Sequence, residues 1–352
     1  MATMQDVATR ANVSLSTVSY AINHTRPISA GTRERIERAM VELDFRPNAI
    51  ARSLASRRSR IVALTFPGIE NRLGGTIMEF VTSAAEAARE RGYHLVVWPY
   101  APSEAGEMCE MSLQGLADGV IVMEVRIDDP RVRALDAAGV PLTMIGRADD
   151  SGDHRCVDID FDATTEQAVE HLAALGHRTI ALLNHSKASR DSGYGPTLRA
   201  HRGYLQAMAR RGLAPRAVWC EENPVAARVA TARLLDSTPD LTAMVAMNED
   251  AVFGVVAELR QREMALPQDF SLLSIVSSPR VAELVQPPLT TLHSPGVELG
   301  RLGVHSLLDQ LENVGPPAGP VLLPCRLEAG QSTGPVSPER LRHWPGQKGT
   351  SA

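Results

Sequence analysis

Residues 3–23 read TMQDVATRANVSLSTVSYAIN, which predicts two short helices around a tight turn. Thr3 and Asp6 have the spacing of a capping pair at the start of the first helix, and apolar residues recur after them at helical intervals. Residues 12–14 form the turn, and Ser14 caps the second helix. The outward face of that helix is polar and carries short side chains, as reading bases in a major groove requires.

Two interpretations fit this stretch equally well, since helix-turn-helix patterns are short and degenerate. It is either an ordinary helical hairpin with a polar outer face or a helix-turn-helix, whose second helix fits the major groove of DNA. A third amphipathic helix, capped by Ser29 and running to about Leu43, can close a three-helix core and favours the second interpretation. The DNA-contacting residues of this unit would then be Thr3, Ser14, Leu15, Ser16, Thr17, Tyr20 and Asn23.

The residues after the third helix add a specific resemblance. Residues 46–54 read RPNAIARSL, in which a helix-prone segment follows Pro47, and residues 32–36 read TRERI. Together with VSLSTVSYAIN at residues 13–23, they are similar to the headpiece and hinge of LacI/GalR-family transcriptional regulators. The resemblance continues through the rest of the chain to about Thr333.

The resemblance also implies a hinge that acts on DNA. Residues 48–55 are too few for a stable isolated helix, which needs about 12 to 15 residues in water, so we expect this segment to fold only on DNA. By resemblance Leu54 is an apolar wedge that enters the minor groove, and Asn48, Ala51 and Arg57 contact DNA beside it. The alternative is a passive tether in which Leu54 packs on the core.

The charge of the chain is divided unevenly. Residues 1–60 contain ten Arg, no Lys and five acidic residues, a net charge of +5, whereas the remainder carries −10, for a total of −5 over 352 residues. A basic arm on an acidic body confines the attraction for nucleic acid to the arm. The weak overall negative charge is therefore compatible with DNA as a partner.

The cysteines and the hydropathy pattern point to a reducing, aqueous compartment. Cys109, Cys156, Cys220 and Cys325 are far apart and form no C-x-x-C or Cys/His cluster, so we expect no metal site and no cofactor. The N-terminus has no apolar run of signal-peptide length, and no stretch approaches about 18 consecutive apolar residues. We expect a soluble, cytoplasmic protein without a membrane partner.

From Ile61 onward the pattern changes to short apolar runs that alternate with helical stretches. The predicted strands are 61–66, 94–98, 119–123, 140–145, 179–183, 243–247 and 272–276. The predicted helices are 76–91, 104–116, 130–138, 163–175, 199–211, 226–235 and 250–262. Short apolar runs separated by helices imply parallel sheets that are covered on both faces, an α/β fold.

By resemblance this α/β core is two-lobed and similar to periplasmic binding proteins. The expected domains are a headpiece at 1–47, a hinge helix and linker at 48–59, an effector-binding and dimerisation core at 60–333 and a disordered tail at 334–352. Within the core we expect a first lobe of about 60–159 with 289–316, and a second lobe of about 160–288 with 317–333.

Enzyme signatures are missing from the sequence. It contains no G-x-x-x-x-G-K-[ST] phosphate loop, no G-x-G-x-x-G after a strand, no H-E-x-x-H and no G-x-S-x-G. We therefore expect no catalytic residues and no enzymatic activity. The alternative is an α/β solute-binding or sugar-metabolising protein with an accessory headpiece. Such a protein would need a signal peptide, or a paired base and nucleophile, and the sequence offers neither.

The resemblance places a small-molecule effector between the lobes. The contacts that it implies are Asn71, Arg147, Arg199, Asn248 and Ser277. Asn248 has a strand-end amide that can both donate and accept, although a turn cap before the following helix explains it equally well. Family members that bind sugars often have an arginine where this chain has Ala200 and an acidic pair where it has Ser277 and Ser278. A sugar is therefore one candidate effector among several.

These observations predict a sequence-specific transcription factor. We expect a homodimeric repressor whose headpieces bind a near-palindromic operator in double-stranded DNA and whose core binds a small effector.

Overall fold

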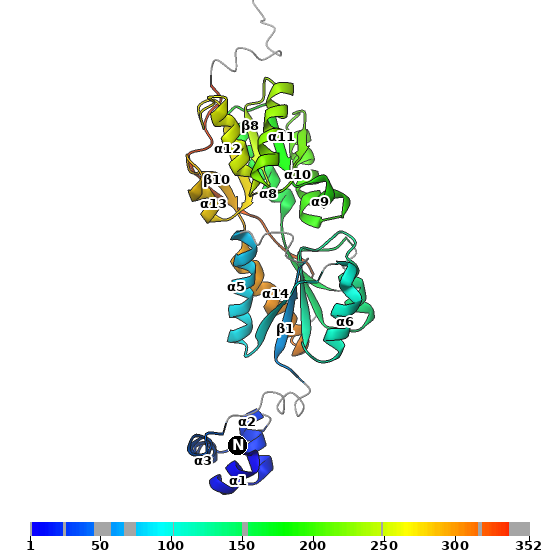
Figure 1. Ribbon diagram of the computed structural model, residues 1–352, viewed down its shortest axis with the longest axis vertical. Helices are drawn as coiled ribbons and strands as arrows, with labels where there is room; N and C mark the ends of the chain where they lie inside the picture. The colour runs from blue at the N-terminus through cyan, green and yellow to red at the C-terminus, as the bar shows by residue number, and fades with distance from the viewer. Residues whose placement is uncertain are drawn as a thin grey trace, which may run out of the picture.

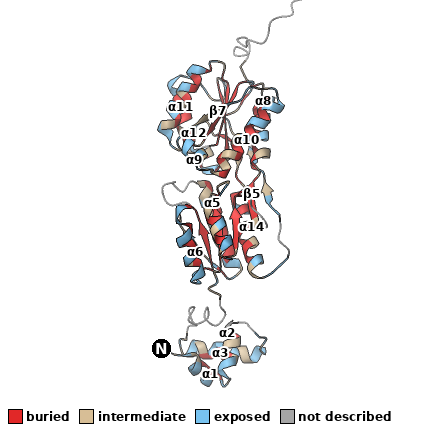
Figure 2. Ribbon diagram, turned by 90° about the vertical axis from the view of Figure 1, so that its right-hand side faces the viewer, coloured by how far each residue is buried: buried red, intermediate tan, exposed pale blue. Residues whose placement is uncertain are grey.

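The computed structural model describes residues 2–23, 26–45, 58–66, 75–100, 102–149, 154–247, 249–315 and 319–337 (Figure 1). Within these ranges the chain forms a three-helix headpiece and an α/β core of two lobes, each built on a six-stranded sheet. Buried residues gather in the sheets and on the helix faces that cover them (Figure 2). The predicted fold class, a helix-turn-helix headpiece followed by a two-lobed α/β core, is confirmed.

The headpiece consists of α1 (Met4–Ala11), α2 (Leu15–Asn23) and α3 (Ala30–Glu42). The predicted capping pair is present: the hydroxyl of Thr3 accepts the backbone N–H of Asp6 at 3.3 Å, and the carboxylate of Asp6 accepts the N–H of Thr3 at 2.8 Å. Ser14 and Ser29 cap α2 and α3 through their hydroxyls, as predicted. The buried residues between the helices are Val7, Ala8, Ala11, Val18, Ala21, Ile36 and Ala39.

The first lobe contains a parallel sheet of order β11-β5-β4-β3-β1-β2. Its strands are β1 (Ile61–Thr65), β2 (His94–Trp98), β3 (Gly119–Met123), β4 (Leu142–Ile145), β5 (Arg155–Ile159) and β11 (Val321–Leu323). Its helices are α5 (Gly75–Glu90), η1 (Pro102–Glu104), α6 (Ala105–Leu113), α7 (Pro130–Ala137) and α14 (Gly296–Leu311). Every residue of β3 is buried, as expected for a central strand with helices on both faces.

The second lobe contains a sheet of order β12-β10-β9-β8-β6-β7, in which only β12 is antiparallel to its neighbour. Its strands are β6 (Ile180–Asn184), β7 (Arg216–Trp219), β8 (Ala243–Ala246), β9 (Ser271–Ser277), β10 (Thr290–His293) and β12 (Arg326–Glu328). Its helices are α8 (Phe161–Ala174), α9 (Lys187–Asp191), α10 (Gly195–Arg210), α11 (Pro224–Ser237), α12 (Ala251–Gln261) and α13 (Pro279–Leu284). None of the helices in the described residues is long and apolar enough to cross a membrane.

Two of the expected lobe boundaries are wrong. The sequence placed residues from 289 onward in the first lobe, but β10 pairs with β9 of the second sheet, with Thr290 opposite Leu273. It placed residues from 317 onward in the second lobe, but β11 pairs with β5 of the first sheet, with Val321 opposite Val157. The apolar pattern of a short strand does not reveal which sheet the strand joins, because partners far away in the chain decide it.

The start of the predicted disordered tail is ordered. The backbone N–H of Val336 donates to the carbonyl of Leu175 at 3.0 Å. The carbonyl of Gly334 lies 3.0 Å from Nε2 of His177, and the N–H of Gly334 donates to the hydroxyl of Ser271 at 3.0 Å. Residues 334–337 therefore belong to the second lobe, and residues 338–352 lie outside the described residues.

Helices α5 and α14 pack closely because glycines of α14 leave room for α5. A Cβ on Gly300 would overlap the hydroxyl of Ser83 and come within 2.6 Å of the carbonyl of Phe80. At the far end of the pair, Arg91 forms ion pairs of 3.2 Å with Asp309 and 2.5 Å with Glu312. The two helices thus form one unit that spans the first lobe.

Candidate functional site

The exposed face of α2 carries residues that the sequence proposes as DNA contacts. Val18 and Ala21 are buried in the headpiece core, so the first turn and the opposite side of α2 face outward. Leu15 is 45% exposed, and Ser16 beside it is also exposed. An exposed first turn is the part of a recognition helix that reaches base edges.

Three hydroxyl groups cluster at this first turn. The Oγ of Ser14 lies 2.7 Å from Oγ of Ser16 and 2.7 Å from Oγ1 of Thr17, and it accepts the N–H of Thr17 at 3.1 Å. Hydroxyls both donate and accept, so this cluster can match either kind of group on a base edge. Thr3 is exposed at the start of α1, and the side chain of Asn23 lies outside the described residues.

The predicted hinge contacts Asn48, Ala51, Leu54 and Arg57 also lie outside the described residues and remain predictions. The segment that follows them is bound firmly to the first lobe. Arg58 donates from Nη2 to the carbonyl of Leu311, the last residue of α14, at 2.6 Å. The N–H of Ser59 donates to the carboxylate of Asp118 at 2.6 Å. Arg58 and Ser59, at the end of the predicted hinge and linker, are therefore held against the first lobe at the C-terminal end of α14 and just before β3.

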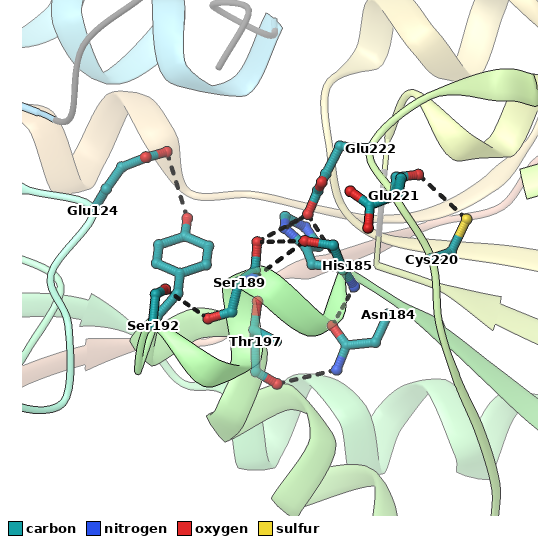
Figure 3. A network of polar contacts seen from close by, with 11 residues as sticks. Glu124, Asn184, His185, Ser189, Ser192, Thr197, Cys220, Glu221 and Glu222 are labelled. Atoms are coloured by element: carbon teal, nitrogen blue, oxygen red, sulfur yellow. Dashed lines mark hydrogen bonds and ion pairs between the residues drawn. The ribbon is translucent and has the colours of Figure 1, made fainter. Parts of the chain in front are cut away.

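The facing surfaces of the two lobes carry a second group of polar residues. Residues 125–127, after β3, and residues 193–195, before α10, are joined by backbone hydrogen bonds of 2.8 and 3.1 Å. Beside this junction, the hydroxyl of Tyr194 lies 3.5 Å from Oε1 of Glu124 (Figure 3). Burial raises the pKa of Tyr194, with a further contribution from the charge of Glu124, so the phenol stays protonated and donates.

Glu222 is the centre of a polar network on the second lobe (Figure 3). Its Oε1 accepts the N–H of Ser186 and the hydroxyl of Ser189, both at 2.9 Å, and lies 3.5 Å from Nδ1 of His185. Burial by itself would raise the pKa of Glu222, but the hydrogen bonds and the nearby His185 outweigh burial and lower it. Because its side chain is 34% exposed, Glu222 is an ionised acceptor that a ligand can reach.

Glu79 and Glu249 lie at another contact between the lobes. Oε1 of Glu249 accepts the N–H of Ser278 at 3.0 Å, and its Oε2 accepts the hydroxyl of Thr76, in α5 of the first lobe, at 3.4 Å. Oε2 of Glu79 lies 3.9 Å from Nε2 of His293, and burial raises the pKa of Glu79. A carboxylate therefore stands next to Ser278, although the sequence has no acidic residue at that position.

Arg147 and Arg199, both predicted effector contacts, lie together between the lobes. Nη2 of Arg199 donates to the carbonyl of Arg147 at 2.8 Å, and Nε of Arg147 lies 3.3 Å from Oδ2 of Asp158. Arg199 is only 3% exposed, burial lowers its pKa, and its bond to the Arg147 carbonyl joins the second lobe to the first. Its role as an effector contact stays a prediction. The side chain of Arg147 is 21% exposed and remains a candidate ligand contact.

The other predicted effector contacts have different outcomes. Ser277 is fully buried, and its hydroxyl is hydrogen-bonded to Ser274, so that hydroxyl is used within the second lobe. Asn71 and Asn248 lie outside the described residues and stay predictions. Within the parts of the chain that the structure describes, no cluster of three or more His, Cys, Asp or Glu residues could hold a metal ion.

Sequence reasoning missed most of the polar residues between the lobes. The missed residues are Glu79, Glu124, His185, Tyr194, Glu222, Glu249 and His293. Four of them were detectable, because Glu124, His185, Glu222 and Glu249 each come within three residues of the end of a strand. Ligands of open α/β sheets bind outside the carboxyl ends of the strands, so residues at these positions are candidates even without a motif.

Comparisons with known proteins agree with both parts of this structure. Residues 3–48 match the family described as bacterial regulatory proteins, lacI family, and residues 169–333 match a periplasmic binding protein-like domain. The HTH-type transcriptional regulator CelR of Thermobifida fusca is 31% identical over 320 residues, which cover 88% of this chain and 92% of that protein. Catabolite control protein A of Priestia megaterium is 25% identical, covering 94% of this chain and 99% of that protein.

A solved structure is similar over nearly the same length. The lac repressor dimer bound to operator and the anti-inducer ONPF aligns with a TM-score of 0.80 and 25% identity, covering 95% of this chain and 99% of the repressor. The likeness thus extends over the headpiece and both lobes in one continuous chain. With its helix-turn-helix, its two-lobed core and a regulator 31% identical over most of its length, the chain belongs to the lacI family of bacterial regulatory proteins.

Proposed function

We propose that this chain is a homodimeric transcriptional repressor that binds a near-palindromic operator and responds to a small effector bound between its lobes. The observation that carries the proposal is the exposed first turn of α2, with its cluster of Ser14, Ser16 and Thr17 hydroxyls, on a headpiece joined to a two-lobed core. The domains that we propose are a headpiece at 1–47, a hinge at 48–59 and a core from residue 60. The protein acts in the cytoplasm, where it meets the chromosome, and catalyses no reaction.

The proposed DNA contacts are Thr3, Ser14, Leu15, Ser16, Thr17, Tyr20 and Asn23 in the headpiece, with Asn48, Ala51, Leu54 and Arg57 in the hinge. A dimer places two copies of α2 on successive turns of one face of DNA, so the operator should consist of two inverted half-sites. The test is binding-site selection with the full chain and a random DNA library. A recovered motif with inverted symmetry supports the proposal. A protein that enriches no sequence over random DNA would contradict it.

The effector site that we propose lies between the lobes and includes Glu124, Arg147 and Glu222, with Asn71 and Asn248 as further contacts. Ionised carboxylates accept hydrogen bonds, so they favour a ligand rich in hydroxyl groups. Glu249 beside Ser278 supports this class, because it supplies a carboxylate close to the position where sugar-binding family members often have an acidic pair. A solved structure of a transcriptional regulator named CelR, 26% identical to this chain, is a complex with cellobiose, which agrees with a sugar as the class of effector.

A thermal-shift screen of the full chain with sugars and nucleosides tests this site, because a ligand that binds only the folded state raises the melting temperature. Glu222→Gln should abolish the shift that the best sugar produces in the wild-type protein. Glu221→Gln is the matched control, since Glu221 is the exposed neighbour and should leave that shift unchanged. A nucleoside that shifts the protein while every sugar fails would reject the sugar class.

The packing of α5 and α14 suggests how the two sites communicate. The first turns of α5 and α14 pack together near the contact between the lobes. Thr76 of α5 donates to Glu249 of the second lobe, and Gly296 of α14 packs against Glu79, which lies 3.9 Å from His293 of the second lobe. The last residue of α14, Leu311, holds Arg58 at the hinge exit. A ligand that changes the contact between the lobes can therefore shift the position of the hinge exit. The packed pair of α5 and α14 would then couple the effector site to the DNA-binding headpiece.

A further inference from the structure

Tyr20 and Arg26 form a pair beside helix α2 of the headpiece. Tyr20 lies on α2, one residue before the buried Ala21, and its ring is partly exposed. The guanidinium carbon of Arg26 lies over this ring, 5.1 Å from the ring centroid. A cation at this distance is attracted to the face of an aromatic ring, so the pair holds the arginine side chain beside the recognition helix.

Arg26 has no acidic partner among the described residues, in contrast to other headpiece arginines. Arg10 forms an ion pair of 2.5 Å with Glu42, and Arg38 forms one of 3.0 Å with Glu34. Arg26 is exposed, and its one described interaction is with the Tyr20 ring. Its charge is therefore available to an external anion or acceptor.

The backbone that follows Arg26 is constrained. Pro27 follows it and fixes its own φ angle, and Ile28 packs against the headpiece core. Ser29 then caps α3, with its hydroxyl 3.3 Å from the N–H of Thr32. Arg26 is thus held at its ring contact on one side and by the ordered start of α3 on the other, and little conformational freedom would be lost when it binds DNA.

The chemistry of the pair fits guanine. A guanidinium is a planar fork whose N–H groups can donate to O6 and N7 of a guanine at once, and stacking on an aromatic ring leaves that fork free to do so. Tyr20 by itself offers a single hydroxyl. We propose that Arg26 reads one guanine in each operator half-site, with the ring of Tyr20 as its positioning residue. This inference rests on the proposed function as a DNA-binding repressor.

Binding-site selection with full-length variants tests the inference. Arg26→Ala should remove the preference for a G·C pair at one position of each half-site and leave the other positions as in the wild type. At that position the loss should be about 5- to 150-fold in relative affinity, the range for one bidentate contact to guanine. Tyr20→Leu, which removes the ring, should relax the same position. Tyr20→Phe, which keeps the ring, should retain the G·C preference there.

Two further variants separate base reading from a phosphate contact. Arg38→Ala is the matched control, because Arg38 is an exposed headpiece arginine with an acidic partner, and the selected motif should not change. Arg26→Lys keeps the charge but not the planar fork, so it should not restore the G·C preference. If Arg26→Ala weakened all sequences equally and lowered the salt dependence, or if lysine restored wild-type selection, Arg26 would contact only phosphate and the inference would be wrong. A wild-type protein that selects no motif would instead contradict the proposed function.

Discussion

The backbone N–H of Gly195 in the second lobe donates to the carbonyl of Val125 in the first lobe at 3.1 Å. The N–H of Ile127 returns a bond of 2.8 Å to the carbonyl of Gly193, so two backbone hydrogen bonds connect the lobes. Only glycine fits at residue 195, since a Cβ there would lie 2.8 Å from the carbonyl oxygen of Val125 and would overlap the guanidinium of Arg199. This junction is a direct contact between the lobes, separate from the chain segments that connect them.

Gly195→Ala should therefore separate the lobes at this junction. The loss of two backbone hydrogen bonds should lower the free energy of unfolding by about 1 to 3 kcal/mol, and small-angle scattering should show a more open core. Gly106→Ala is the control: Gly106 lies in α6 with no atom within 4 Å of its added Cβ, so alanine should be neutral or stabilise by up to about 1 kcal/mol. Equal scattering profiles for Gly195→Ala and the wild type would show that the junction does not hold the lobes together.

The loop before α7 depends on a fully buried ion pair. The carboxylate of Asp129 accepts hydrogen bonds from Nη2 of Arg131 at 2.8 Å and from the backbone N–H of Arg126 at 3.0 Å. The side chains of Asp129 and Arg131 are both 0% exposed. Burial by itself would raise the pKa of Asp129, but these bonds and the charge of Arg131 lower it. Asp129→Ala leaves Arg131 charged and buried, and should cost about 3 to 5 kcal/mol of unfolding free energy in urea denaturation.

The neighbouring residue provides the control for this prediction. Asp128 forms an ion pair with Arg133, but its side chain is 78% exposed. Asp128→Ala should change the free energy of unfolding by no more than about 1 kcal/mol, because exposed pairs contribute little. Similar losses in the two variants would mean that burial of the Asp129 pair does not determine its contribution.

His177 should make the stability of the second lobe depend on pH. Its Nδ1 lies 2.9 Å from the hydroxyl of Thr242, and its Nε2 lies 2.9 Å from that of Ser271. Burial lowers the pKa of His177 below the ordinary value of 6.5, although the Gly334 carbonyl opposes that shift. The unfolded chain then binds the proton more readily than the folded protein. The free energy of unfolding should therefore fall as the pH drops below 6.5 toward the folded pKa.

Urea denaturation across a pH series from about 5 to 8 measures this effect. Burial also lowers the pKa of His171 and of His185, so the wild-type slope should contain contributions from several histidines. His177→Gln should be less stable than the wild type at neutral pH and should show a flatter dependence below pH 6.5. An unchanged slope in this variant would mean that His177 does not titrate in that range.

DNA binding should weaken steeply with salt because phosphate contacts by arginines release counterions. The arginines available for such contacts in the sequence of the headpiece and predicted hinge are Arg10, Arg26, Arg46, Arg52, Arg57, Arg58 and Arg60. Arg58 is bonded to Leu311, and Arg26 is assigned above to a guanine, so the phosphate contacts that we expect are the other five arginines. The logarithm of the operator affinity should fall linearly with the logarithm of salt concentration between about 50 and 200 mM. An affinity that does not respond to salt over this range would contradict the prediction.

The sequence by itself determined the parts of this protein that depend on near neighbours. The caps at Thr3, Ser14 and Ser29 involve residues only three apart, and the apolar face of each headpiece helix follows a fixed spacing. The strand from His94 to Trp98 and the strand from Gly119 to Met123 were predicted to the residue. Local hydrogen bonds and side-chain periodicity suffice for such elements, and together with the family resemblance at residues 13–23 and 46–54 they indicated the fold class.

Only the tertiary structure decided which distant segments meet. It placed β10 in the second sheet and β11 in the first, brought Glu249 to Ser278, and set the guanidinium of Arg26 over the Tyr20 ring. It also buried Ser277, which the sequence had proposed for the effector. Each of these outcomes depends on how packed elements are placed in space, and a linear pattern of residue types carries no information about that placement until the core has formed.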